Sequence, residues 1–304
     1  MASLVCGSLA FDTITDFPGR FAEQILPDQV HILNVSFLVP TLRREYGGCA
    51  GNIAYNLNAL GGQAVVLAAV GGDGTGYLAH LSQLGIDVSA VLTDSDSYTA
   101  QAMIITDRDN NQITAFHPGA MQSAHQIGLP AREDIRLAIV GPDGREAMLR
   151  HARDLKAAGI PFIFDPGQGL PMFNGEELRA FIAQATWVAV NDYEARMLCE
   201  RTGLSLAQIA DSHLEGLLVT LGAEGCDVWV KGHCTRVAGV KADAVVDPTG
   251  CGDAFRGGLL YGLEQGWPLE RCVELGNRLG ALKIGHRGGQ NHPIDRAAWG
   301  CAPR

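Results

Sequence analysis

Short apolar runs alternate with amphipathic stretches of helical length along most of the chain, and this alternation strongly limits the fold. The apolar runs are 4–6, 65–70, 137–140, 162–164, 187–190, 217–220 and 228–230. The helical stretches are 52–60, 76–84, 146–158 and 194–201. Continuous apolar strands that alternate with helices predict a mainly parallel sheet with helices on both faces. Ligands of such sheets bind at the carboxyl ends of the strands.

Two regions break the alternation. Residues 30–46 and 99–117 are rich in strand patterns, with no helix between their strands. Such ribbons cannot belong to a doubly wound sheet, so they predict a separate small β-sheet. Its apolar residues, 37–39 among them, could pack on their own domain or form a dimer contact.

Size and charge limit the classes of function. A chain of 304 residues, 47% of them hydrophobic, is long enough for one α/β domain with a small appendage. A net charge of −10 argues against binding to nucleic acid or an anionic membrane. The eight cysteines include no C-x-x-C pair and no histidine at zinc-ligand spacing, so we expect small buried thiols. No signal peptide or membrane-length apolar run is recognisable, which predicts a cytoplasmic protein.

The segment 247–253, Asp-Pro-Thr-Gly-Cys-Gly-Asp, stands before an apolar helical stretch. Its two glycines let the backbone turn and expose N–H groups, and the helix beginning near Asp253 adds its positive dipole. An aspartate at such an anion site is unfavourable unless it removes a proton from a hydroxyl group. The amides of Gly250, Cys251 and Gly252 would then hold the phosphate that this hydroxyl attacks. The pattern predicts phosphoryl transfer with Asp253 as the base; alternatively, Asp253 only caps a helix.

Four further segments stand with 247–253 in a characteristic order along the chain. They are 45–54 (Glu-Tyr-Gly-Gly-Cys-Ala-Gly-Asn-Ile-Ala), 191–194 (Asn-Asp-Tyr-Glu), 220–225 (Thr-Leu-Gly-Ala-Glu-Gly) and 287–289 (Arg-Gly-Gly). Together with 247–253 they closely resemble the ribokinase-like, or PfkB, family of carbohydrate and nucleoside kinases, from about residue 6 to residue 289. The resemblance implies a three-layer α/β/α sandwich with a mainly parallel central sheet, as one domain over 1–304. It also implies a small β lid formed by about 13–46 and 97–120, through which a homodimer would form.

The acceptor site follows from the same resemblance. Asp12, just past the first strand, would bind the hydroxyl groups of the acceptor, and Gly48, Gly51 and Asn52 would complete the site. As structural residues, Asp12 would be a turn residue and Asn52 a helix N-cap. For Asn52 both roles can hold together.

The resemblance also implies ATP as the phosphate donor. The nucleotide-binding residues would be Asn191, Thr220, Gly222, Gly225 and Asn277. Glu194 would hold Mg²⁺ through water, although Asn191 and Glu194 equally match a helix capping box. Asp247, with carbonyl groups near 287–289, resembles a monovalent-cation site of many relatives, for which K⁺ is the expected ion.

The sequence constrains the identity of the phosphate acceptor less than any other feature of the predicted function. Phe116 and His117 end the second ribbon, and an aromatic ring beside an imidazole suits stacking on a base better than binding a small polyol. Phe37 and Tyr46 could add aromatic walls; alternatively all four are packing residues. The segment 164–168, Phe-Asp-Pro-Gly-Gln, resembles prokaryotic adenosine-kinase-like members. We therefore expect a nucleoside kinase, with adenosine favoured and the ribose 5′-hydroxyl as acceptor.

Three alternatives stand beside this expectation. A sugar kinase of the same family is the nearest. A ligand-binding protein without catalysis could share the scaffold, but the retained Asp253 argues for an enzyme. A dinucleotide-binding oxidoreductase is disfavoured, because 72–76 lacks the G-x-G-x-x-G spacing that opens a helix after the first strand.

Overall fold

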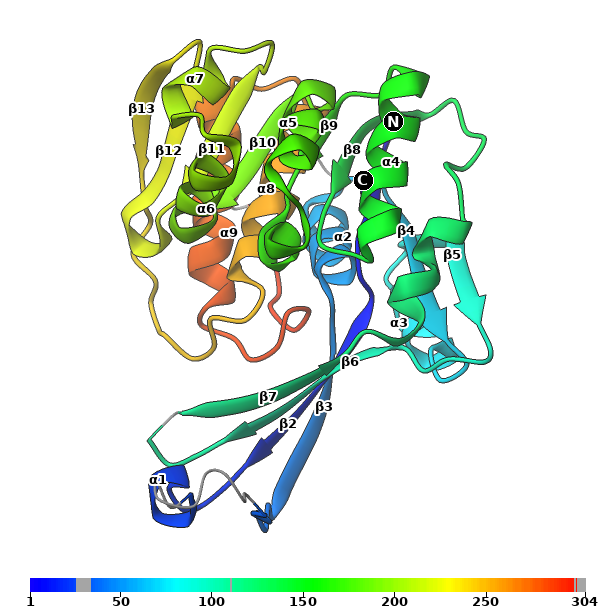
Figure 1. Cartoon of the computed structure of the whole chain (residues 1–304), viewed down its shortest axis with the longest axis vertical. Coiled ribbons are helices and arrows are strands. Elements are labelled where there is room, and N and C mark those ends of the chain that lie inside the picture. Colours follow the sequence, from blue (N-terminus) through cyan, green and yellow to red (C-terminus); the bar gives the residue numbers. More distant parts are fainter. Residues whose placement is uncertain (26–33, 110, 298, 300–304) are drawn as a thin grey trace.

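The computed structural model describes residues 1–25, 34–109, 111–297 and 299, and they form two β-sheets (Figure 1). The larger sheet contains β1 (Ala2–Cys6), β4 (Ala64–Gly71), β5 (Asp87–Asp94), β8 (Ile135–Val140), β9 (Phe162–Phe164), β10 (Trp187–Asn191), β11 (Gly216–Thr220), β12 (Gly225–Val230) and β13 (His233–Ala238). Their order is β13-β12-β11-β10-β9-β8-β1-β4-β5. Neighbours from β11 to β5 pair in parallel, whereas β12 and β13 pair antiparallel. The predicted mainly parallel sheet is confirmed.

Helices cover both faces of this sheet, which confirms the three layers. One face carries α2 (Cys49–Leu60), α3 (Thr75–Gln83), α8 (Cys251–Glu264) and α9 (Leu269–Lys283). The other carries α4 (Arg145–Ala158), α5 (Gly175–Gln184), α6 (Asp192–Thr202) and α7 (Leu206–Ala210). Short 3-10 turns lie at η2 (Gly119–Gln126), η3 (Gly167–Met172) and η4 (Gly222–Glu224).

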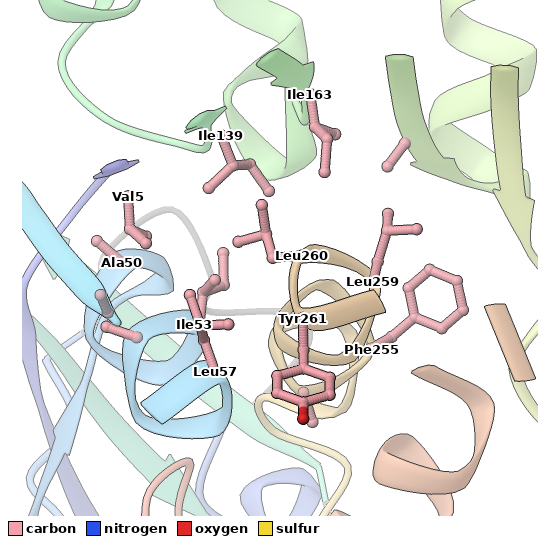
Figure 2. Close-up of a cluster of buried hydrophobic side chains, with 14 of the residues drawn as sticks. Val5, Ala50, Ile53, Leu57, Ile139, Ile163, Phe255, Leu259, Leu260 and Tyr261 are labelled. Carbon is pink, nitrogen blue, oxygen red and sulfur yellow. The ribbon is translucent and has the colours of Figure 1, made fainter. Parts of the chain in front are cut away.

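Alternating side chains of the central strands supply both cores. In β1, Val5 faces the α2 and α8 side, whereas Leu4 and Cys6 face the other side. Figure 2 shows Val5 with Ile53 of α2 and Leu260 of α8 in the first of these clusters. A fully buried aliphatic side chain stabilises the fold by about 1.5–3 kcal/mol. This packing fixes α8, and with it the position of Gly250 and of the first turn of α8 at the carboxyl edge of the sheet.

The smaller sheet projects from the main body (Figure 1). It consists of β2 (Ala10–Asp16), β3 (Thr41–Gly47), β6 (Ala100–Thr106) and β7 (Gln112–His117), in the order β3-β2-β6-β7. The short helix α1 (Phe21–Gln24) follows β2. The predicted separate β-sheet is confirmed, while residues 30–33 of its first predicted ribbon lie outside the described residues.

The two faces of this sheet differ in chemistry. Registered neighbours Asp12, Ala102 and Phe116 share one face, which is directed toward the main body. The opposite face exposes Met103 and Ile113 to 43% and 41%. An exposed apolar face is where the sequence predicts a contact between subunits, and the homodimer stays a prediction.

Two properties of the described chain bear on the expected class of protein. None of its helices is both long enough and apolar enough to cross a membrane. The cysteines within the described ranges carry free thiols, several of them buried, as expected from their spacing.

Candidate active site

A cavity of about 1080 Å³ lies at the carboxyl ends of the central strands. It is lined by residues that end these strands or follow them within three positions: Ser8, Asp143, Asp165, Asn191 and Thr220. Its opposite wall is the inner face of the four-stranded sheet. The cavity therefore occupies the place where parallel α/β sheets bind ligands.

The loop before α8 forms one end of the cavity. Gly250 has a φ of 77°, a left-handed conformation that glycine adopts without steric cost, and α8 begins at the next residue. Gly250 and Gly252 line the cavity, and the first-turn amides of a helix have no intrahelical acceptor. The amide of Cys251 instead donates to the main-chain oxygen of Pro248 at 3.2 Å. Cys251 does not itself line the cavity, and the role of its amide as a phosphate donor stays a prediction. Burial raises the pKa of its thiol.

Asp253 lies in the first turn of α8 and ends a chain of hydrogen bonds. Asn52 Nδ2 donates to Asp253 Oδ2 at 2.8 Å, and Gln290 Nε2 donates to Asn52 Oδ1 at 3.1 Å. The same Gln290 group lies 2.7 Å from the hydroxyl of Tyr77, which donates to the main-chain oxygen of Gly47 at 2.6 Å. Asn52 is therefore oriented by partners on both sides. It lies inside α2, so its role as an N-cap is excluded.

The environment of Asp253 tunes it as a proton acceptor. Burial raises the pKa of Asp253 to about 6, and the hydrogen bond from Asn52 partly offsets this shift by lowering the pKa. Asp165 raises the pKa further and Arg256 opposes this effect. A carboxylate with this pKa is a stronger base than an ordinary aspartate and is still mostly ionised at pH 7.

Asp12 lies within β2, not in a turn, and faces the same cavity. Burial raises its pKa to about 6, and the negative charge of Asp253 adds to the shift. A Cβ atom on Gly47 would clash with the Asp12 carboxylate. Gly48, with a φ of 84°, turns the chain from β3 into α2 and lines the cavity beside Asp12.

The inner face of the small sheet supplies an apolar wall. Phe116 pairs with Ala102, and Thr114 pairs with Ile104; all four line the cavity. His117 was predicted to act beside Phe116, but this prediction is wrong, because successive residues of a strand point to opposite faces. His117 belongs with Gln101 on the outer face.

The two other predicted aromatic walls are packing residues. Tyr46 stacks on Tyr77 and His80, with ring centroids 4.7 and 4.3 Å apart. Phe37 packs against Phe17 and Phe21 at 4.9 and 5.1 Å. The alternative that these aromatic residues pack in the fold therefore holds for both.

Gly51 was expected in the acceptor site but is buried in α2. A Cβ atom on Gly51 would overlap the hydroxyl of Tyr77 and lie 3.0 Å from Gln290 Nε2. Its lack of a side chain makes room for the hydrogen bonds that orient Asn52, so its contribution to the site is indirect.

Asn191 and Glu194 lie at the start of α6 and line the cavity. Asn191 Oδ1 accepts from the Glu194 amide at 2.8 Å, and Glu194 Oε2 accepts from the Asn191 amide at 2.8 Å. The capping-box alternative is thus realised. Burial raises the pKa of Glu194, and Asp165 raises it further.

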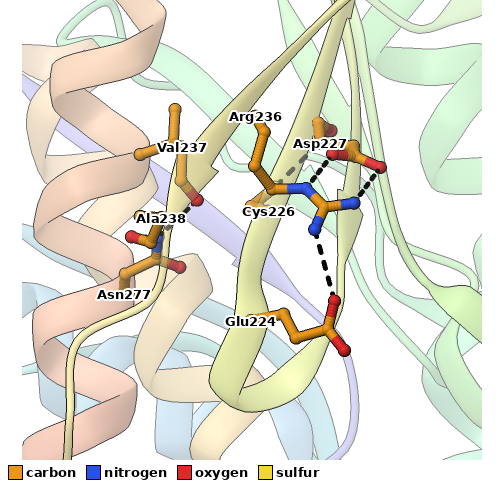
Figure 3. Close-up of polar contacts among 7 residues, drawn as sticks. All are labelled: Glu224, Cys226, Asp227, Arg236, Val237, Ala238 and Asn277. Carbon is orange, nitrogen blue, oxygen red and sulfur yellow. Dashed lines mark hydrogen bonds and ion pairs between the residues drawn. The ribbon is translucent and has the colours of Figure 1, made fainter.

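Of the remaining predicted nucleotide residues, two line the cavity and two do not. Thr220 and Gly222 line it. Asn277 instead donates to the main-chain oxygens of Val237 and Ala238 at 3.4 and 3.0 Å, which joins α9 to β13 (Figure 3). Gly225 lies against the same strand, where a Cβ atom would clash with the oxygen of Val237. These two positions support the edge hairpin, which Figure 3 also shows tied by Arg236 and Asp227.

Two buried groups of the cavity were not assigned a role from the sequence. Asp165 forms a bidentate ion pair with Arg256, which lies one turn after Asp253 on α8. Arg256 Nε and Nη2 donate to the Asp165 carboxylate oxygens at 3.0 and 2.9 Å. Asp143 is 2% exposed; its Oδ1 accepts from the Gly144 amide, and its Oδ2 has no hydrogen-bond partner among the described residues. Burial raises the pKa of Asp143 to about 8. Asp165 directly follows the predicted strand 162–164, and Asp143 lies three residues after the predicted strand 137–140; these positions were the available signal.

The cavity is acidic. Its lining contains the carboxyl groups of Asp12, Asp143, Asp165, Asp192, Glu194 and Asp253, and the guanidinium of Arg256. Within the described residues no group of three or more His, Cys, Asp or Glu side chains is arranged to hold a metal ion directly. Mg²⁺ keeps several of its waters and needs few protein ligands, so Glu194 and its neighbours fit an ion bound through water.

The place predicted for a monovalent cation is differently occupied. Both carboxylate oxygens of Asp247 accept amide hydrogen bonds at 2.9 Å, from Thr249 and Gly288. The main-chain oxygen of Asp247 accepts from the ammonium group of Lys283 at 2.8 Å. A positive charge of the chain itself is therefore already present at this position.

Known proteins share this architecture over nearly the whole chain. A nucleoside kinase from Burkholderia thailandensis in complex with inosine is 52% identical, with a TM-score of 0.87 over 97% of this chain and 95% of that one. A nucleoside kinase from Methanocaldococcus jannaschii is 32% identical over 85% of each chain, and Arabidopsis thaliana probable fructokinase-4 is 27% identical over 88% of this chain and 90% of its own. The family model described as pfkB family carbohydrate kinase matches residues 22–296. The chain belongs to the pfkB family of carbohydrate kinases.

Proposed function

We propose that this protein transfers the γ-phosphoryl group of ATP to the ribose 5′-hydroxyl of a nucleoside, with adenosine favoured. The observation that carries the proposal is the placement of Asp253, beside Gly250 and Gly252, in one cavity with Asp12 and the apolar wall around Phe116. Phosphoryl transfer needs a positioned hydroxyl, a base and donors for the charge on the phosphate, and these residues supply all three.

Each part of the site has a role in this reaction. Asp253 accepts the proton of the 5′-hydroxyl while the oxygen forms a bond to the γ-phosphorus. The bond from that phosphorus to the β–γ bridging oxygen breaks, and its electron pair leaves with ADP. The amides of Gly250 and Gly252 donate hydrogen bonds to the transferring phosphoryl group, where charge stabilisation is most effective. Asp12 accepts hydrogen bonds from the ribose hydroxyls, and Thr220 and Gly222 contact the nucleotide.

A divalent cation suits the acidic lining. A nucleoside triphosphate entering a cavity with so many carboxyl groups is repelled unless its charge is neutralised, and Mg²⁺ supplies this neutralisation when bound with ATP. Glu194 would hold the waters of the ion. Its carboxylate is itself kept in place by Asn191, which limits how far those waters can shift.

The apolar wall favours a nucleoside over a free sugar. Phe116 lies in register with Ala102 and Asp12 on the inner face of the sheet, so a base stacked on its ring would place the ribose toward Asp12. A monosaccharide would leave this wall exposed to water. The names of the relatives from Burkholderia thailandensis and Methanocaldococcus jannaschii, both nucleoside kinases, agree with this choice of acceptor.

An acceptor panel tests the proposal. We expect ADP release from Mg-ATP with adenosine or inosine, and little or none with ribose or fructose. Phe116→Ala should raise KM for nucleosides by about 10-fold, because base–aromatic stacking contributes about 1–3 kcal/mol. His117→Ala, altered at the next residue on the outer face, is the matched control and should keep the KM of the unaltered enzyme. Turnover on free sugars alone would overturn the nucleoside assignment and leave Phe116 a packing residue.

The pH dependence follows from the raised pKa values. Asp253 and Asp12 both have a pKa of about 6 and interact, and each must be ionised to accept its hydrogen bond. We expect kcat/KM to be constant between pH 7 and 8 and to fall below about pH 6, with a logarithmic slope between 1 and 2. Nucleotide affinity measured over the same pH range distinguishes protonation of ATP from protonation of Asp253 and Asp12. A limb near pH 4, the ordinary range of aspartate, would contradict the assignment of Asp253 as the base.

A further inference from the structure

Lys283 is the last residue of α9, and its side chain is completely buried, with an exposed fraction of 0%. Its Nζ donates to the main-chain oxygen of Asp247 at 2.8 Å and to that of His286 at 2.9 Å. Burying an ammonium group costs folding free energy unless the group is well hydrogen-bonded, so a buried lysine at this position indicates a specific role.

The two carbonyl groups belong to different loops. Asp247 stands in the loop that leads through Gly250 into α8, and His286 stands in the turn that follows α9. The amide of Asp247 also donates to the main-chain oxygen of Ile284 at 3.0 Å, and its side chain accepts from the Gly288 amide at 2.9 Å. The ammonium group therefore closes a set of contacts that holds residues 247–252, the phosphate loop, to the segment after α9.

The charge of Lys283 is placed behind the phosphate loop. Burial lowers the pKa of Lys283, whereas the negative charges of Asp247 and Asp253 favour its protonated form. Its two described acceptors are main-chain carbonyl oxygens, the groups that coordinate K⁺ in selectivity filters. A compact ammonium on a flexible stem can fill such a position where a planar guanidinium would not fit.

We propose that the Lys283 ammonium takes the place of a monovalent cation beneath the phosphate loop, so that the enzyme neither binds nor requires K⁺ there. An ion at this position would compete with Nζ for the same carbonyl oxygens and would be repelled by its charge. Lys283 is thus a positioning residue: it fixes the carbonyl of Asp247, and through the loop it fixes Gly250 and the start of α8. Only the kinetic part of its test rests on the proposed function.

Thermal melting tests the proposal without catalysis. We expect the Tm of the unaltered protein to be the same in KCl and in tetramethylammonium chloride at equal ionic strength. In Lys283→Ala the vacated carbonyl groups become available, so K⁺ or NH₄⁺ should raise the Tm saturably. Lys156→Ala, an exposed lysine of α4, is the matched control and should respond to neither ion. A K⁺-specific rise in the Tm of the unaltered protein would overturn the proposal, and this result does not depend on whether a variant folds.

The kinetic test separates positioning from general stability. Lys283→Met should lower kcat by about 10- to 100-fold, since the donors of the phosphate loop lose their fixed position. KM for the nucleoside should change little, because Asp12 and Phe116 stand on the other sheet. Addition of K⁺, NH₄⁺ or methylammonium to Lys283→Ala should restore part of kcat. Activation of the unaltered enzyme by K⁺ would refute the role of Lys283. A Lys283→Met variant that keeps full kcat without added K⁺ would refute it as well. If no acceptor is phosphorylated at all, the proposed function fails and the melting result still decides this inference.

Discussion

Asp253→Asn is expected to lower kcat by about 100- to 10,000-fold, the range that a positioned general base contributes. The amide is almost the same size as the carboxylate but cannot accept the hydroxyl proton. Binding of adenosine and of ATP, followed by calorimetry, should persist, because the loop and the apolar wall are unaltered. A variant with near-normal turnover would contradict the assignment of Asp253 as the base and leave it a structural residue of the first turn of α8. An unaltered protein that binds nucleosides but turns over none would instead support a ligand-binding protein without catalysis.

The stability of the same variant provides an internal control. The pKa of Asp253 is raised from 3.8 to about 6 in the folded protein, so its ionised form is disfavoured by folding. This cost is fully present above about pH 6 and disappears as the pH falls below the unfolded value near 3.8. Asp253→Asn should therefore melt at the same or a higher temperature at pH 8, while Asp96→Asn, at an exposed surface position, should change neither Tm nor kcat.

Asp12→Ala is expected to lower kcat/KM for nucleosides by about 100- to 10,000-fold. A carboxylate that accepts two hydroxyl hydrogen bonds loses about 1.5–3 kcal/mol for each when it is removed. Most of the effect should appear in KM, since Asp12 is placed to bind the acceptor and Asp253 to accept its proton. Steady-state kinetics with adenosine as the varied substrate would measure this separation.

Deoxynucleosides identify the bonds that Asp12 makes. If Asp12 accepts from a ribose hydroxyl, 2′-deoxyadenosine or 3′-deoxyadenosine should already be a poor substrate, and Asp12→Ala should reduce its turnover much less than it reduces that of adenosine. Equal losses on all three nucleosides would contradict a direct contact and leave Asp12 a structural residue of β2.

The sequence predicted the strands that are buried on both faces. Six of the seven apolar runs lie in β1, β4, β8, β9, β10 and β11, because strands of a parallel sheet that is covered on both faces are apolar throughout. The seventh, 228–230, lies in the antiparallel strand β12. The edge strands β5 and β13 were not predicted. Their residues are mostly half-buried or exposed, so no continuous apolar run marks them.

Local motifs predicted residues that line one cavity but could not orient every side chain. Asp253, Gly250 and Asn52, which all line it, were predicted as site residues because glycines and a polar residue beside a helix start carry a short-range signal. Phe116 and His117 were predicted together, since a motif identifies neighbours and not the face that each occupies. Strand pairing then directs one into the cavity and the other away from it.

The residues that organise the site from a distance carried no local signal at all. Gln290 contacts Asn52 across 238 positions of the chain and Tyr77 across 213. In the sequence, Lys283 is indistinguishable from any lysine in the last turn of a helix, where a positive charge is favourable. Its burial beneath the phosphate loop depends on how α9 packs against α8, which no short window of sequence contains.

The division of the cavity between two sheets has a consequence for how substrate preference can diverge. Asp253 and the phosphate loop are held by the nine-stranded sheet, whereas Phe116, Ala102 and Ile104 belong to strands of the four-stranded one. Substitutions at these three positions alter the wall without touching the packing that positions α8. Natural selection could therefore exchange one acceptor for another at little cost to turnover, and relatives that are named for nucleosides and for fructose share this one scaffold.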